Sequence, residues 1–155
     1  MSCPQCAVNP RAHSFIKIGQ KADTGYWYTA AGKAEELVNT PEKFGFFRLH
    51  MSEAKQDPHW IWIFDCEGMT SRHTSSIGFM KRLVGSLSNE HAILLKEIWV
   101  VHPNMFMRAA IVLLSPFMNK HLVSKIKFIE STTDIEFVYH LTGVNVFSSP
   151  WKSRV

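Results

Sequence analysis

The stretch WIWIFDCEG, from Trp60 to Gly68, constrains the fold more than any other part of the sequence. Five apolar residues run from Trp60 to Phe64 without a break, and Asp65 follows them immediately. An apolar run of strand length without polar alternation is typical of a strand that is buried on both faces, as strands of parallel sheets are. Because Asp and Gly form turns readily, residues 65–68 are predicted to be the turn that ends this strand.

Strands and helices alternate along the rest of the chain. Before Trp60, the sequence predicts strands over Ser14–Ile18 and Gly25–Thr29, and a helix that begins at Pro41 with Thr40 as its N-cap. After Phe64, the predicted elements are a helix with an apolar stripe at Ile77, Met80, Val84 and Leu87, a strand over Glu97–Val101, a helix over Met105–Leu114 that Pro116 ends, a strand over Lys125–Glu130 and a helix over Thr133–Gly143. This order predicts an α/β fold with a mixed, largely parallel β-sheet flanked by helices.

The composition is typical of one soluble globular domain. The chain has 155 residues, of which 46% are hydrophobic and 19% are charged. Its first residues lack the apolar core of a signal peptide, and its apolar runs are shorter than the ~20 residues of a membrane span. We therefore expect a cytoplasmic protein, with residues 1–12 as a flexible tail and residues 13–155 as a single domain. The net charge of +4 mildly favours anionic partners.

Two groups of residues raise the question of chemistry. Asp65, Glu67 and His102 follow two predicted strands and could form an acid–base group, but Asp65 to Gly68 is better explained as a hydrogen-bonded turn. Phosphate-binding loops and a nucleophile elbow are absent from the sequence, so an enzyme is not expected. Cys3-x-x-Cys6 is half of a zinc site, and His13 is the only further ligand nearby. The sequence favours two free thiols in a tail, with no metal and no cofactor.

The predicted helix Met105–Leu114 is apolar around its whole circumference, apart from Arg108. Such a helix must be buried on every side, cover an apolar cavity or pack against another chain. The basic residues Lys120, His121, Lys125 and Lys127 follow it, and they could meet lipid phosphates or form a solvated surface. No nucleic-acid-binding signature is present, so nucleic acid is not expected as a partner.

Taken in order, the segments WIWIFDCEGM, LKEIWVVHPNMF and SPFMNKHLVSKIKFIES resemble the CRAL-TRIO family of lipid-binding domains. Asp65-Cys66-Glu67-Gly68 is similar to the family's D-x-x-G turn, and Ser115-Pro116-Phe117-Met118 to its conserved proline motif. The segment VVHP, from Val100 to Pro103, is most similar to the corresponding segment of the divergent BCH branch. The resemblance covers Trp60 to Leu141, and we expect a domain without the helical N-terminal extension of full-length members.

The resemblance implies that Met105–Leu114 is the mobile gate helix over a lipid pocket. Lys125 falls where phosphatidylinositol-binding members place a head-group lysine. Two positions depart from that pattern: Leu122 replaces the accompanying threonine, and Ile93 replaces the acidic head-group residue. The implied ligand-binding residues are Trp62, Phe64, Val101, Met105, Phe106, Ala109, Ala110, Leu113, Phe117 and Lys125.

The expected function is the binding of one lipid or other small hydrophobic molecule between the sheet and the gate helix, with transfer of this molecule as an extension of that function. An anionic membrane surface is the expected peripheral partner. The alternative is a BCH-like interaction module that binds small GTPases or a second copy of the chain through the same apolar helix.

Overall fold

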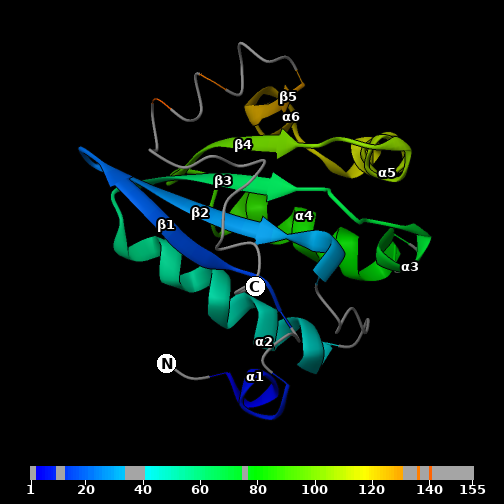
Figure 1. Ribbon diagram of the computed structural model, residues 1–155, viewed down its shortest axis with the longest axis horizontal. Coiled ribbons are helices and arrows are strands. Elements are labelled where there is room, and N and C mark those ends of the chain that lie inside the picture. Colours follow the sequence, from blue (N-terminus) through cyan, green and yellow to red (C-terminus); the bar gives the residue numbers. More distant parts are fainter. Residues whose placement is uncertain are drawn as a thin grey trace.

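The computed structural model describes residues 3–9, 13–33, 41–74 and 77–130, together with Glu136 and His140 (Figure 1). Five strands form one sheet in the order in which they occur in the sequence. They are β1 (Ile16–Lys21), β2 (Thr24–Ala30), β3 (His59–Asp65), β4 (Leu95–Val101) and β5 (Ile126–Ile129). The pair β1–β2 is antiparallel, whereas β2, β3, β4 and β5 run parallel to one another. The expected mixed, largely parallel α/β sheet is confirmed.

One described helix precedes β1, and the others lie between successive parallel strands from β2 to β5. The described helices are α1 (Pro4–Val8), α2 (Pro41–Ser52), α3 (Ser71–Thr74), α4 (Ile77–Asn89), α5 (Met105–Leu114) and α6 (Lys120–Lys125), with 3-10 turns at Ala31–Lys33, Glu53–Gln56 and Ser115–Phe117. Right-handed crossovers that always step in the same direction place their helices on the same face of a sheet. In agreement with this, α2, α4, α5 and α6 contribute to one hydrophobic core on one face (Figure 1).

Strand β3 is buried on both faces, as its unbroken apolar run predicts. Trp60 and Trp62 belong to the core on the helical face. Ile61 and Ile63 point to the opposite face, where they join a second cluster with Tyr28. A strand with period-two geometry needs apolar residues at every position only when both faces exclude water, which is the case here.

The segment expected to be a flexible tail contains structure in its described part. Residues Pro4–Val8 form α1, with Pro4 at its first position, and the side chain of Cys3 is buried. Proline is suited to the first helical position, but a five-residue helix has too little periodicity to be recognised from sequence. The domain boundary at residue 12 stays a prediction. The predicted helix over Thr133–Gly143 lies outside the described residues, except for Glu136 and His140.

His91, in the turn between α4 and β4, is buried against the ring of Trp60. The side chain is 1% exposed, and the two ring centroids lie 5.2 Å apart in a T-shaped arrangement. Burial lowers the pKa of His91 to about 4, and the positive charge of Lys55 adds to this effect while Glu90 opposes it. In an unfolded chain, a histidine has a pKa of ~6.5. The folded protein therefore holds this imidazole neutral.

We expect this histidine to make the protein sensitive to acid. Protonation favours the unfolded chain, so the stability linked to neutral His91 is complete above about pH 6.5 and is lost as the pH falls toward 4. Between about pH 7.5 and pH 4.5 the loss should amount to ~2–3 kcal/mol. The variant His91→Phe retains a ring against Trp60 and cannot be protonated. In urea unfolding at both pH values, it should lose ~2–3 kcal/mol less than the wild type. Equal losses in both proteins would contradict this role of His91.

Candidate functional site

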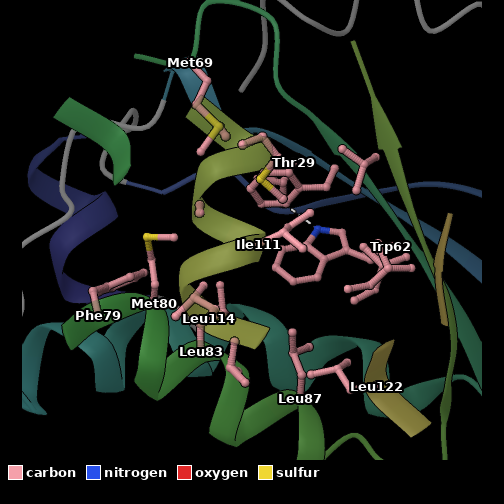
Figure 2. Close-up of a pocket in the computed structure, with 18 of the residues that line it drawn as sticks. Thr29, Trp62, Met69, Phe79, Met80, Leu83, Leu87, Ile111, Leu114 and Leu122 are labelled. Carbon is pink, nitrogen blue, oxygen red and sulfur yellow. Dashed lines mark hydrogen bonds between the residues drawn. The ribbon is translucent and has the colours of Figure 1, made fainter. Parts of the chain in front are cut away.

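An apolar cavity of about 130 Å³ lies between the sheet and helices α4 and α5 (Figure 2). Its wall contains Trp62 from β3, and Ile98 and Val100 from β4. The other lining residues are His13, Ser14, Thr29, Ala31, Phe47, Phe64, Met69, Phe79, Met80, Leu83, Val84, Leu87, Met107, Ala110, Ile111, Leu114, Met118, Leu122 and Ile126. Three of these residues, His13, Ser14 and Thr29, carry polar side chains, and the Thr29 hydroxyl accepts a hydrogen bond from the Trp62 indole N–H at 2.8 Å. The cavity is therefore suited to an apolar ligand.

Helix α5 presents two different faces. Met107, Ala110, Ile111 and Leu114 line the cavity, and Figure 2 shows Ile111 and Leu114 directed toward Trp62 and the α4 side chains. The spacing of these residues, i, i+3, i+4 and i+7, is that of one helical face. On the outer face, Met105, Val112 and Leu113 are 75%, 71% and 62% exposed. The helix thus covers a cavity with one face and leaves an apolar face open.

The structure brings together three of the ten residues named from the sequence. Trp62, Phe64 and Ala110 line the cavity, and they stay predicted ligand contacts. Six others lie outside its wall: Val101, Met105, Phe106, Ala109, Leu113 and Phe117. Val101 belongs to the cluster on the opposite face of the sheet, because it is adjacent to the inward-facing Val100 in a strand. Met105, Phe106, Ala109 and Leu113 belong to α5, for which the sequence gives no choice of face, and Phe117 belongs to the proline motif after it.

Lys125 lies outside the cavity wall as well. Its ammonium group donates a hydrogen bond to the backbone carbonyl of Ala92 at 2.6 Å. Partial burial lowers the pKa of this lysine. Ile93, which occupies the position of the family's acidic residue, is an exposed side chain on the same loop. The lysine thus connects α6 to the loop before β4, and its predicted head-group contact would require this hydrogen bond to be exchanged.

The turn after β3 is held by the carboxylate of Asp65, which is 1% exposed. One oxygen accepts hydrogen bonds from the Tyr28 hydroxyl at 2.5 Å. The other accepts from the backbone N–H of Glu67 at 3.0 Å and lies 2.9 Å from Nδ1 of His102. Burial, followed by the hydrogen bond to Asp65, raises the pKa of Tyr28. This arrangement supports the explanation of residues 65–68 as a hydrogen-bonded turn.

Asn104 connects that turn to the beginning of α5. Its side-chain oxygen accepts a hydrogen bond from the backbone N–H of Met107 at 3.1 Å and caps the helix. Its amide nitrogen donates to the carbonyls of Cys66 and Met69, at 3.2 and 3.1 Å. Asn104 is not among the site residues named from the sequence, although an asparagine directly before an apolar run is a recognisable N-cap. It anchors one end of the helix that covers the cavity.

Comparison with known proteins identifies the family. The family described as "Divergent CRAL/TRIO domain" matches residues 40–147, which is more than half of the chain. The crystal structure of Sfh5 superimposes with a TM-score of 0.63 at 13% sequence identity, over 79% of this chain and 50% of that chain. The chain thus spans about half the length of Sfh5. A search of the curated proteins finds no match.

The chain belongs to the divergent CRAL/TRIO domain family. The resemblance drawn from its motifs is confirmed at this level, and the BCH branch stays a prediction. The Sfh5 structure shares the α/β fold of this chain. Among the helices that the structure describes, none has the length and hydrophobicity needed to cross a bilayer.

Proposed function

We propose that the protein binds one lipid or similar hydrophobic molecule in the cavity under α5, and that α5 acts as the gate. The observation that carries this proposal is the cavity itself, which is lined mainly by apolar side chains from the sheet, α4 and α5. Each methylene group that enters such a site contributes ~0.8 kcal/mol from its removal from water. In this proposal the ligand partitions between a membrane and the protein, and this exchange requires no catalytic group.

The size of the cavity supports the part of this proposal in which α5 moves during binding. At about 130 Å³, it is similar to the ~150 Å³ apolar cavity that binds benzene in an engineered protein. This space accepts a ring or a short segment of chain, whereas complete ligands usually occupy ~300–1,000 Å³. A longer acyl chain therefore enters when α5 moves outward. The exposed Val112 and Leu113 favour this movement at a membrane, where the apolar outer face is shielded from water.

The contacts of α5 fit a hinged gate. Asn104 fixes its N-terminal end to the turn after β3. The only charge on the helix, Arg108, forms an exposed ion pair with Glu130 and stacks over the ring of Phe128. Exposed ion pairs contribute only ~0–1 kcal/mol, so this contact can break during exchange. Strand alternation places the exposed Lys127 on the opposite side of β5 from Phe128, so the proposed membrane contact rests on the apolar outer face of α5.

The first test is to identify a ligand that remains bound. The protein is purified without detergent, measured by native mass spectrometry and then extracted with organic solvent. One lipid per chain in the spectrum, recovered in the extract, would support the proposal and give the ligand class. A bare chain that also fails to bind a fluorescent fatty acid such as parinaric acid would contradict it.

The second test fills the cavity. In Ala110→Trp the indole should occupy the space that the guest requires, because Ala110 is buried in the cavity wall. We expect loss of parinaric acid binding, measured by energy transfer from tryptophan. Ala109→Trp is the matched control, since Ala109 is exposed on the same helix and should retain binding. Circular dichroism and thermal unfolding must show that both variants fold. Unchanged binding by folded Ala110→Trp would exclude this cavity as the site.

The exposed face of α5 also supports a second function, the BCH-like interaction module. Here Val112 and Leu113 would contact a small GTPase or a second copy of the chain, since exposed apolar patches mark interfaces. Leu113→Glu separates the two functions. It should abolish association that depends on the outer face, measured by light scattering over a range of concentrations, and leave the cavity intact. A monomeric wild type at all concentrations would remove self-association from this alternative.

A further inference from the structure

Two cysteines and two histidines from distant parts of the chain meet beside α1. Cys3 precedes α1, Cys6 lies within it, His13 precedes β1, and His50 is in the last turn of α2. The sulfur atoms of the cysteines and one ring nitrogen of each histidine all lie within 4.8 Å of one another. Three segments of the fold therefore converge on one point with four potential metal ligands.

The distances within this cluster match those of a tetrahedral zinc site. Zn²⁺ binds cysteine sulfur at ~2.3 Å and histidine nitrogen at ~2.0–2.1 Å, so tetrahedral angles place a sulfur and a nitrogen ~3.6 Å apart. Here Nδ1 of His13 lies 3.7 Å from the Cys3 sulfur and 3.6 Å from the Cys6 sulfur. Nε2 of His50 lies 3.3 Å from the Cys6 sulfur. The observed separations are close to what one shared ion would require.

The charges and the environment of the four side chains also fit zinc. Two thiolates neutralise a divalent cation, so the complete site carries no net charge and can be buried with Cys3 and His13. A neutral imidazole and a thiolate are the forms of histidine and cysteine that bind a metal. On binding, each thiol gives up its proton to solvent as its sulfur bonds to the metal. Two sulfurs and two imidazoles are a ligand set of structural zinc sites.

We propose that Cys3, Cys6, His13 and His50 bind one Zn²⁺ ion, which connects α1 and the start of β1 to the end of α2. Cys3, Cys6 and His13 lie outside the residues matched by the family, and His50 lies within them. The site would thus attach the N-terminal segment to the family domain. It replaces the two free thiols that the sequence favours, and it is independent of the lipid-binding proposal.

The proposed ion also touches the wall of the apolar cavity. His13 lines the cavity and packs its ring against Phe47, another lining residue, with centroids 5.7 Å apart. Fixing His13 to a metal fixes this part of the wall. The arrangement explains why a polar ring can border an otherwise apolar space, since its coordinating nitrogen faces the cysteines.

The test measures metal in the protein as it is produced. The chain is purified without a chelator and without a polyhistidine tag, and its metal content is determined by inductively coupled plasma mass spectrometry. We expect one zinc per chain. X-ray absorption of this sample should show two sulfur and two nitrogen neighbours, and cobalt substitution should give the intense visible bands of a tetrahedral site with a sulfur charge-transfer band. These measurements need no variant.

Variants then assign the ligands. Cys6→Ser and His50→Gln should each weaken zinc binding by more than the ~10–100-fold that is lost with a residue supporting a ligand. Cys66→Ala and His121→Gln are the controls, since they remove a thiol and an imidazole outside the cluster and should retain one zinc. Retention of zinc in His50→Gln would overturn the four-ligand site. Absence of zinc after addition of the metal to reduced wild type, or a Cys3–Cys6 disulfide in the intact mass of freshly prepared protein, would overturn the proposal.

Discussion

Replacing Asp65 with alanine should lower the free energy of unfolding by about 3–5 kcal/mol, the usual cost of removing one partner of a buried charged network. The carboxylate is almost completely buried and receives hydrogen bonds from the Tyr28 hydroxyl and the Glu67 backbone. It also lies against Nδ1 of His102. In the variant, the fully buried Tyr28 side chain loses this acceptor in a place that water does not reach, so its hydroxyl retains an unmet desolvation cost.

Urea unfolding at neutral pH measures this effect, and Glu67→Gln is the control. Glu67 is exposed in the same turn, and its substitution should change the free energy of unfolding by no more than ~0.5 kcal/mol. Tyr28→Phe removes one of the donors and should cost ~1 kcal/mol, less than the loss of the shared acceptor. A stable Asp65→Ala protein would show that the carboxylate is dispensable for folding. The acid–base group formed by Asp65, Glu67 and His102 would then need to be tested with substrates.

The sheet could be predicted because its signals are local. The run Trp60–Phe64 has no polar residue, and both of its alternating faces are buried in the structure. The strand Glu97–Val101 and the helix Met105–Leu114 appear with the same pattern of a buried strand, a polar turn and an apolar helix. Each of these elements was predictable from fewer than fifteen consecutive residues, without knowledge of the rest of the chain.

The face of α5 that lines the cavity could not be predicted. A helix that is apolar on all sides has no polar face that would identify its solvent-exposed side. Met107 and Ile111 therefore have no sequence feature that distinguishes them from Met105 and Leu113. Only the positions of β4 and α4 decide which side is covered. The assignment of Val101 to the cavity was wrong for a different reason. Adjacent strand residues point to opposite faces of the sheet, and an unbroken apolar run does not show which of them face the helices.

Contacts between residues that are far apart in the sequence are the third feature that the sequence does not predict. Cys3-x-x-Cys6 was visible as half of a metal site, and His13 as a third ligand. His50 is separated from His13 by two strands and most of α2, and it appears in the sequence as an ordinary helical residue. Its approach to the Cys6 sulfur depends on how α2 crosses the sheet. No local pattern encodes that distance.

A methyl group added at Gly32 should be one of the most damaging changes in the protein. Gly32 lies in the 3-10 turn after β2, directly against the turn that follows β3. A Cβ atom there would lie 2.4 Å from the carbonyl oxygen of Glu67 and 2.6 Å from the carbonyl carbon of Gly68. Backbone atoms cannot move away as a flexible side chain can, so Gly32→Ala should destabilise the fold by about 2–4 kcal/mol.

The matched control is Gly85→Ala in α4, where an added Cβ meets no heavy atom within 4 Å apart from the neighbouring backbone of its own helix. There the same substitution should stabilise the protein by ~0.5–1 kcal/mol, because alanine loses less backbone freedom in a helix than glycine. Thermal and urea unfolding of both variants provide the comparison.

The two turns held together at Gly32 also carry the lining residues Ala31 and Met69. Separating the turns should therefore weaken parinaric acid binding in Gly32→Ala under conditions where the variant is still folded. Equal stability of the two alanine variants would mean that the two turns are not in contact, and the cavity wall formed by Ala31 and Met69 would then have to be placed differently.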